Sequence, residues 1–165
     1  MARITPEEIS ARALRNCAIH ELGHAWMAEK YGYYCGRLWL ERNPAGFADP
    51  YGPERMWDGH FGYGHAKTDL HERRIAMAGW LAVYLGDDVE QDLTDRDLWD
   101  YLAQALEDGE LSATDAAPLI DRKTRRLTFS IYDVHCVTVY LRRIWPKLLL
   151  EAEEEIEKAL KDYQP

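Results

Sequence analysis

The sequence predicts a mainly α-helical fold with a small β-sheet, which belongs to the α+β class. Two observations predict the helices: both ends of the chain carry long stretches of helix-compatible residues, and a central stretch repeats apolar residues at helical spacing. One observation predicts the sheet, because two short strand-like segments flank a region dense in glycine, proline and asparagine. With 165 residues, the chain is expected to form one domain, 1–165, with a core that needs no disulfides.

The first predicted helix has a defined beginning and end. Thr5 can act as its N-cap, Pro6 suits its first position, and Glu8 completes a capping box. Helical character then continues to about Lys30, where the glycine at position 32 interrupts it.

Two short strands are predicted after this helix. Residues 35–41 suit the first strand, and residues 61–66 suit the second, although two glycines weaken the second segment. Residues 42 to about 59 are dense in turn-forming residues and are expected to form the loop between the strands.

The central helices are predicted from apolar spacing and from capping residues. Residues 68–85 carry an apolar face, and a further helix is expected from Thr94 to Leu106. Ser112 can cap a short helix because Asp115 lies three residues further on.

The C-terminal part is predicted to form a helical pair. Residues 130–161 are helical in character, and Pro146 lies among them. A proline removes a backbone donor and clashes with the preceding turn, so a kink or break is expected there.

Charge and cysteine usage narrow the classes of function. The chain carries 20 Lys and Arg against 29 Asp and Glu, a net charge of -9, which disfavours nucleic-acid binding. The apolar runs are too short to span a membrane. Cys17, Cys35 and Cys136 are odd in number and widely spaced, which is typical of free thiols, so a cytoplasmic location is expected.

Residues 20–24 read HELGH, which is an HExxH motif. On a helix, residues four apart project from one face, so the imidazoles of His20 and His24 can converge on one Zn²⁺ ion. Glu21 would reach a water molecule beside the metal and could act as general base and then as acid. The alternative is a chance match, since only three residue types are fixed.

Two histidines leave a catalytic zinc site one protein ligand short. The longer pattern HExxHxxGxxH does not continue here, because Met27 and Lys30 stand where its glycine and third histidine would be. The third ligand must therefore come from further along the chain. The candidates are Glu41, His60, His65, His71, Glu90, Asp92, Asp95, Asp97 and Asp100.

Residues 18–25, AIHELGHA, resemble the zinc helix of the peptidase domain of FtsH-type AAA proteases, whose usual form is HEAGHA. The order of later motifs extends the resemblance to roughly residues 12–107. Residues 38–40 fit the strand that follows this helix in the family, residues 61–63 fit its LGY segment, and residues 78–82 occupy the place of its GGRxAEE helix.

The resemblance implies Asp97 as the third zinc ligand, because residues 95–98 match the family's (S/N)DL segment best. It also implies a peptidase-like part over 1–107, followed by C-terminal helices over 108–165. The sequence departs from the family at Val83 and Tyr84, which stand where the family has glutamates. The family's ATPase module is not found in these residues, so an ATP-independent activity is expected.

The sequence therefore predicts a zinc metalloendopeptidase with His20, His24 and Asp97 as metal ligands and Glu21 as general base. Its expected partner is a peptide or an unfolded protein segment, not nucleic acid or a membrane. The alternative is a non-catalytic or single-target regulatory interaction module that retains the metallopeptidase fold.

Overall fold

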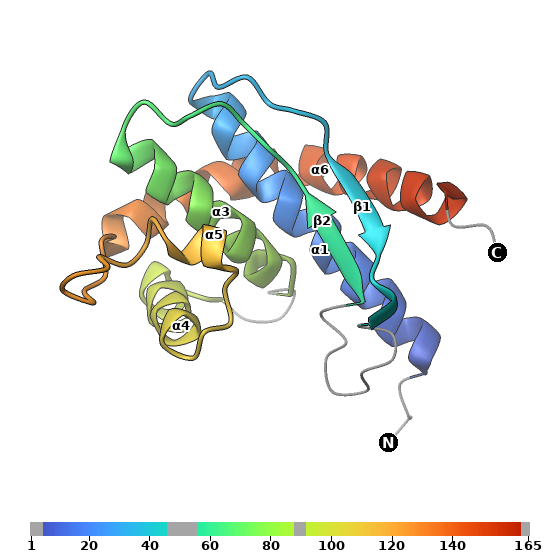
Figure 1. Cartoon of the computed structure of the whole chain (residues 1–165), viewed down its shortest axis with the longest axis horizontal. Helices are drawn as coiled ribbons and strands as arrows, with labels where there is room; N and C mark the ends of the chain where they lie inside the picture. Colours follow the sequence, from blue (N-terminus) through green and yellow to red (C-terminus); the bar gives the residue numbers. More distant parts are fainter. Residues whose placement is uncertain (1–4, 46–55, 88–91, 163–165) are drawn as a thin grey trace.

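Three long helices form the body of the molecule in the computed structural model, which describes residues 5–45, 56–87 and 92–162 (Figure 1). They are α1 (Pro6–Lys30), α3 (Asp69–Asp87) and α6 (Ile131–Asp162). Each of the three packs against the other two. The mainly helical fold with a small sheet, predicted from the sequence, is confirmed. The largest fully buried side chains are Ile19, Met27, Ile75, Met77, Leu81, Leu98, Leu102, Leu119, Leu141, Leu148, Val134 and Val137.

Helix α1 begins and ends where the sequence predicts. The Thr5 side chain accepts a hydrogen bond from the backbone N–H of Glu8, and the Glu8 carboxylate accepts one from the backbone N–H of Thr5. This capping box satisfies two backbone donors at the helix start. The helix ends at Lys30, and Gly32 then adopts a φ of 74°, which favours glycine.

The sheet consists of β1 (Trp39–Arg42) and β2 (Trp57–His60), which pair antiparallel in the register Trp39↔His60. Strand β2 lies against α1, where the Trp57 indole donates a 3.4 Å hydrogen bond to the Ser10 hydroxyl (Figure 1). The first strand thus begins four residues later than predicted.

The second strand was predicted at 61–66, and that position is wrong. The strand instead lies at the end of the segment expected to be loop, of which residues 46–55 lie outside the described part of the chain. Burial of the Trp57 ring stabilises a strand at that position, whereas Gly62 and Gly64 have no side chain to bury. The strand pairing with β1 therefore forms around Trp57. Within 61–66 only Tyr63 pairs, in an isolated bridge to Cys35.

Two shorter helices precede α6. Helix α4 (Asp95–Glu107) starts after the N-cap Thr94, and α5 (Ala113–Ala116) starts after the N-cap Ser112, as the capping residues predict. Helix α4 also packs against α6.

The predicted break at Pro146 does not occur, and α6 is one continuous helix, so the expected C-terminal helical pair is wrong. Pro146 lies on the exposed face. The buried stripe continues on both sides of it, through Leu141, Ile144 and Leu148. Burial of this stripe against the core offsets the single backbone hydrogen bond that proline removes.

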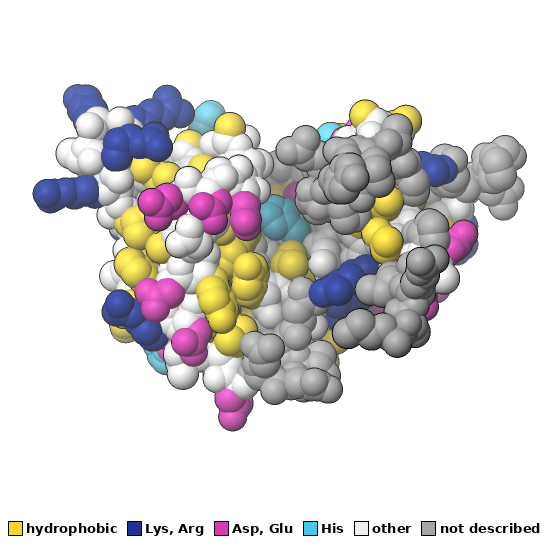
Figure 2. All heavy atoms as spheres, turned by 90° about the horizontal axis from the view of Figure 1, so that it is seen from below, with side chains coloured by type: hydrophobic (Ala, Val, Ile, Leu, Met, Phe, Trp, Pro, Cys, Tyr) yellow, Lys and Arg dark blue, Asp and Glu magenta, His cyan; other side chains and the backbone are white. Residues whose placement is uncertain are grey.

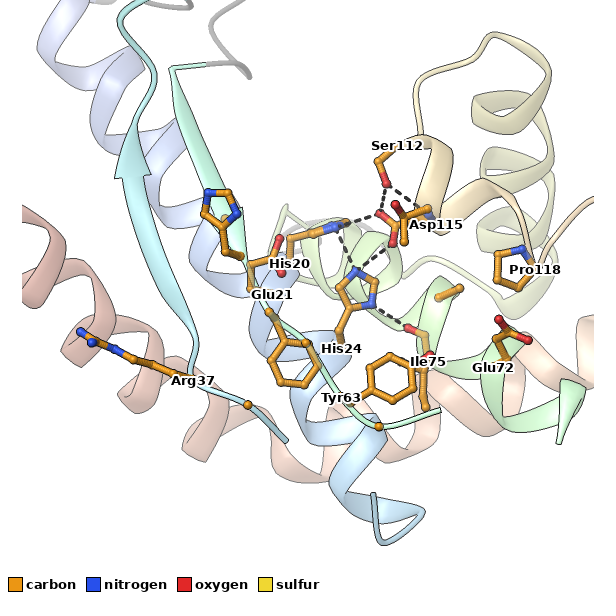
Figure 3. A pocket seen from close by; sticks show the side chains of 18 of the residues that line it. His20, Glu21, His24, Arg37, Tyr63, Glu72, Ile75, Ser112, Asp115 and Pro118 are labelled. Carbon is orange, nitrogen blue, oxygen red and sulfur yellow. Dashed lines mark hydrogen bonds and ion pairs between the residues drawn. The ribbon is translucent and has the colours of Figure 1, made fainter. Parts of the chain in front are cut away.

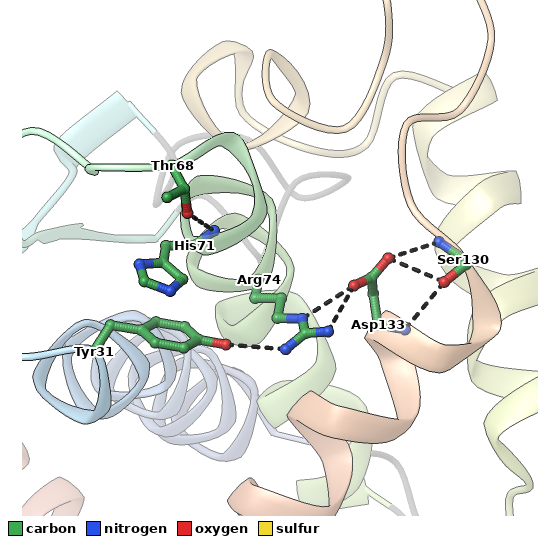
Figure 4. Close-up of polar contacts among 6 residues, drawn as sticks. All are labelled: Tyr31, Thr68, His71, Arg74, Ser130 and Asp133. Carbon is green, nitrogen blue, oxygen red and sulfur yellow. Dashed lines mark hydrogen bonds and ion pairs between the residues drawn. The ribbon is translucent and has the colours of Figure 1, made fainter.

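A polar network joins the ends of the three long helices (Figure 4). Arg74 of α3 donates two 3.0 Å bonds to Asp133 Oδ1 in the first turn of α6, and a 3.4 Å bond to the hydroxyl of Tyr31, which follows α1. Asp133 Oδ2 accepts from the backbone N–H and the hydroxyl of Ser130, each at 3.0 Å. The side chains of Arg74 and Asp133 are only 13% and 9% exposed, so this pair is shielded from solvent.

In the described part of the chain, no helix combines the length and the apolar character that a bilayer crossing requires.

The Arg74–Asp133 pair should make the free energy of unfolding depend on pH in the acidic range. Burial, the largest influence, raises the pKa of Asp133, but hydrogen bonds from Ser130 and Arg74 outweigh it and hold this pKa below its usual value of 3.8. A carboxyl with a lowered folded-state pKa stabilises the fold above its unfolded-state pKa, and the contribution disappears as pH falls through the folded-state value. Asp133→Asn should lower the free energy of unfolding by about 3–5 kcal/mol at neutral pH.

Urea unfolding at several pH values checks this expectation. The gap between wild type and Asp133→Asn should narrow below about pH 4. Asp100→Asn, which breaks the exposed Arg96–Asp100 pair, serves as control and should change stability little. A gap of constant size from pH 7 to pH 3 would contradict the linkage.

Candidate metal centre

The two histidines of the HExxH motif lie on adjacent turns of α1 and face the same point (Figure 3). Their Nε2 atoms are 3.0 Å apart, and their rings meet edge to face with centroids 4.6 Å apart. Asp115 of α5 reaches the same point from the opposite side. Its Oδ2 lies 3.3 Å from His20 Nε2, and its Oδ1 lies 3.4 Å from His24 Nε2.

These three side chains have the spacing of metal ligands. Four ligands in tetrahedral positions about 2.0–2.1 Å from Zn²⁺ are roughly 3.3–3.4 Å from one another, and the distances between the two imidazoles and the carboxylate fall close to this value. In the described part of the chain, His20, His24 and Asp115 are the three side chains close enough together to hold one ion. Two imidazoles and one carboxylate are also a ligand set that catalytic zinc uses.

The tautomer of His24 is set by a backbone contact. Its Nδ1 lies 2.7 Å from the carbonyl oxygen of Ile75 in α3, which can only accept, so Nδ1 carries the proton and donates. In the neutral ring, Nε2 then carries a lone pair that points at His20 and Asp115. A partner of this kind on the second ring nitrogen is typical of metal-binding histidines.

The charges in this cluster favour a cation. Burial, with a smaller contribution from His20, lowers the pKa of His24 to about 4, so this imidazole is neutral at pH 7. Burial also opposes protonation of His20, but the hydrogen bond and charge of Asp115 outweigh it and raise the pKa of His20. Asp115 shows the reciprocal effect, since its contacts with the histidines outweigh its burial and lower its pKa. Both shifts show that the Asp115 carboxylate favours a positive charge at this position.

Two glycines allow the close packing around the cluster. A Cβ atom at Gly79 of α3 would lie 2.4 Å from His24 Nε2 and 2.9 Å from His20 Cε1. A Cβ atom at Gly59 of β2 would lie 2.4 Å from Glu21 Cγ. Any larger residue at either position would displace a side chain of the HExxH motif.

Glu21 lies beside the three ligand-like groups but is not one of them. It lines the same open cavity of about 840 Å³, together with His20, His24 and Asp115. Burial, the main influence, raises the pKa of Glu21, while a positive charge on His20 acts in the opposite direction. Figure 2 shows the entrance as a hollow with a histidine side chain at its floor and carboxylates along one side.

The structure does not bring Asp97, the predicted third ligand, to this cluster, and Asp115 lies beside the two histidines instead. Asp97 is tied to the start of α4, where its Oδ2 accepts from the backbone N–H of Thr94 at 2.9 Å and from the Thr94 hydroxyl at 2.6 Å. Its carboxylate is therefore engaged in capping its own helix.

The other candidates for the third ligand also lie elsewhere. His60 pairs with Glu41 at 2.8 Å, and His71 shares a 2.8 Å hydrogen bond with the Tyr33 hydroxyl. Asp95 pairs with His135 at 2.7 Å, and Asp100 pairs with Arg96 at 3.2 Å. His65 and Asp92 are exposed, and Glu90 lies outside the described residues.

Asp115 was visible in the sequence only as a capping partner of Ser112. The pattern Ser-x-x-Asp occurs again at 130–133, and Thr-x-x-Asp occurs at 94–97. Nothing local distinguishes these three aspartates. The packing of α5 against α3 decides which one approaches the histidines.

Substitution of the two aspartates should separate these assignments. Asp115→Ala should reduce Zn²⁺ affinity by more than the about 10–100-fold that loss of a ligand's hydrogen-bond partner costs, because a ligand itself is removed. Asp97→Ala makes the same chemical change in the same local motif and should leave the affinity unchanged. Isothermal titration with Zn²⁺ measures both. Equal Zn²⁺ affinities for Asp115→Ala and wild type would show that Asp115 is not a metal ligand.

Comparison with known proteins does not assign the chain to a family. No family model matches the chain, and no curated protein matches it either. The resemblance to FtsH-type peptidase domains stays a prediction from the sequence.

Proposed function

We propose that the chain is a zinc-dependent metallopeptidase, with His20, His24 and Asp115 holding the metal and Glu21 moving protons. The observation that carries the proposal is the convergence of these three groups at 3.0–3.4 Å in an open cavity that Glu21 also lines. A purely structural zinc site has four protein ligands and needs no base. Three ligands with a neighbouring carboxylate fit a catalytic site better.

Zinc bound at this position would supply Lewis-acid chemistry, by lowering the pKa of a water molecule and polarising the scissile carbonyl. Glu21 then accepts the proton of the attacking water and passes it to the leaving amine. Its raised pKa suits this exchange, because a base whose pKa is closer to the working pH both accepts and releases a proton readily. Val83 and Tyr84, which stand where the resembled family has glutamates, are not among the residues that line the cavity.

The cavity suits an internal segment of an extended polypeptide. It continues on both sides of the histidines, with Arg37 on the β1 side and Glu72 on the α3 side (Figure 3). Residues 61–64 form one wall. The Gly62 carbonyl accepts from the N–H of Gly36 at 2.7 Å, and the N–H of Gly64 donates to the Tyr34 carbonyl at 3.2 Å. The backbone N–H and C=O of Tyr63, which lies between them, therefore point away from residues 34–36. These groups can pair with a peptide laid along the wall.

The proposal includes a reducing location such as the cytoplasm, which is supported by the free thiols of Cys17, Cys35 and Cys136.

Glu21→Gln is the experiment that tests the enzymatic function. The substitution keeps the size of the side chain and removes its proton acceptor, so kcat should fall by about 10²–10⁴-fold. Zinc content and Tm should stay near those of wild type, because no ligand is lost. His20→Ala should lose both metal and activity. A wild-type protein that binds zinc but cleaves a broad peptide library no faster than Glu21→Gln is a non-catalytic module.

Tyr63→Pro tests binding of the peptide along residues 61–64. Proline removes the N–H that would bond to substrate, and the loss of one hydrogen bond of about 0.5–1.5 kcal/mol should raise KM by roughly 2–12-fold. Tyr63→Ala is the matched control, since it removes the ring and keeps the N–H. Gly64 is less suitable because its N–H already donates to Tyr34. Equal KM values and equal zinc contents for the two variants would show that this backbone does not hold the peptide.

A further inference from the structure

The same capping arrangement occurs three times in the described chain, at 94–97, 112–115 and 130–133. In each, a hydroxyl accepts from the backbone N–H of the aspartate three residues later, at 3.2, 3.1 and 3.3 Å. Each hydroxyl also donates to Oδ2 of that aspartate, at 2.6, 2.9 and 3.0 Å. The three sites therefore form a natural comparison within one molecule.

The site at 112–115 differs from the other two in what the carboxylate does next. Asp97 and Asp133 also accept from the backbone N–H of their cap residue, at 2.9 and 3.0 Å, which closes a reciprocal capping box. The structure has no such bond between Ser112 and Asp115, although both residues are described. Asp115 instead turns its two oxygens toward His20 and His24.

We propose that Ser112 is a positioning residue of the metal centre, which holds the Asp115 carboxylate in its ligand orientation through the 2.9 Å bond to Oδ2. This inference rests on the proposed zinc site. A carboxylate oxygen has two lone-pair directions. The Ser112 hydroxyl takes one of those on Oδ2 and leaves the other facing the histidines.

The position of α5 makes this bond important. The helix has only four residues and none of them is fully buried, although the side chain of Asp115 is only 15% exposed. It contacts α3, whereas both histidines come from α1. The 2.9 Å bond from the Ser112 hydroxyl, which comes from the cap of the same short helix, therefore restrains the rotation of the Asp115 side chain directly. Loss of such a partner typically lowers metal affinity by about 10–100-fold.

Three substitutions separate positioning from helix capping. Ser112→Gly removes the hydroxyl but keeps a residue that tolerates the N-cap position well. We expect its Zn²⁺ affinity to fall by about 10–100-fold, with a change in Tm of the metal-free protein below about 4 °C. Ser112→Thr keeps a hydroxyl and should restore the affinity. Ser130→Gly removes the same bonds at the site tied to Asp133 and should lower Tm while leaving Zn²⁺ affinity unchanged.

Isothermal titration with Zn²⁺ and thermal unfolding of the metal-free proteins give both readouts without any activity assay. Ser112→Gly with wild-type affinity would overturn the inference and leave the zinc site standing. An equal loss of affinity in Ser112→Gly and Ser130→Gly would also overturn it, because the effect would then be general destabilisation. A wild-type protein with no Zn²⁺ affinity would instead refute the proposed function, and this inference with it.

Discussion

The candidate site depends on the contact between α1 and α3 at His24. The Nδ1–H of His24 donates to the Ile75 carbonyl at 2.7 Å, within a buried interface. This bond fixes the rotation of the ring, and the missing side chain at Gly79 lets both imidazoles lie against α3. If α3 moved outward, the rings would lose both the partner that orients them and the surface that separates them from solvent. The geometry of the candidate site is thus a property of helix packing as much as of the HExxH motif.

The electrostatics of the cluster follow from the same burial. The side chain of His24 is only 9% exposed and that of Asp115 only 15%, so water screens their interaction weakly. A lone carboxylate in such a place would be costly, and one neutral imidazole would not offset it. Asp115 outweighs the effect of burial and raises the pKa of His20, which favours a positive charge between the two groups. A divalent cation at this position would satisfy the two imidazoles and the carboxylate at once.

The elements that carry the candidate site come from distant parts of the chain and differ in length. Both histidines and Glu21 lie on the 25-residue α1. A capping box stabilises the start of this helix, and α3 and α6 pack against it. The cavity wall at residues 61–64 follows β2 and pairs with the segment before β1 through an isolated bridge between Tyr63 and Cys35. Asp115 lies on a single helical turn. The HExxH side chains therefore lie on a long, well-packed helix, while the other walls of the cavity come from short segments.

The sequence by itself determined the features that depend on neighbouring residues. Thr5, Thr94 and Ser112 cap helices as predicted, and the spacing of His20 and His24 placed both on one face of α1, because capping and helical periodicity act over three or four residues. Only the tertiary structure decided three features: the strand at Trp57, the unbroken α6 at Pro146, and the position of Asp115 rather than Asp97 beside the histidines. Asp97 and Asp115 follow the same local pattern. Their different environments arise because α5 packs onto α3 beside the histidines while the Asp97 carboxylate stays on its own cap, and no interaction between near neighbours in the sequence encodes that difference.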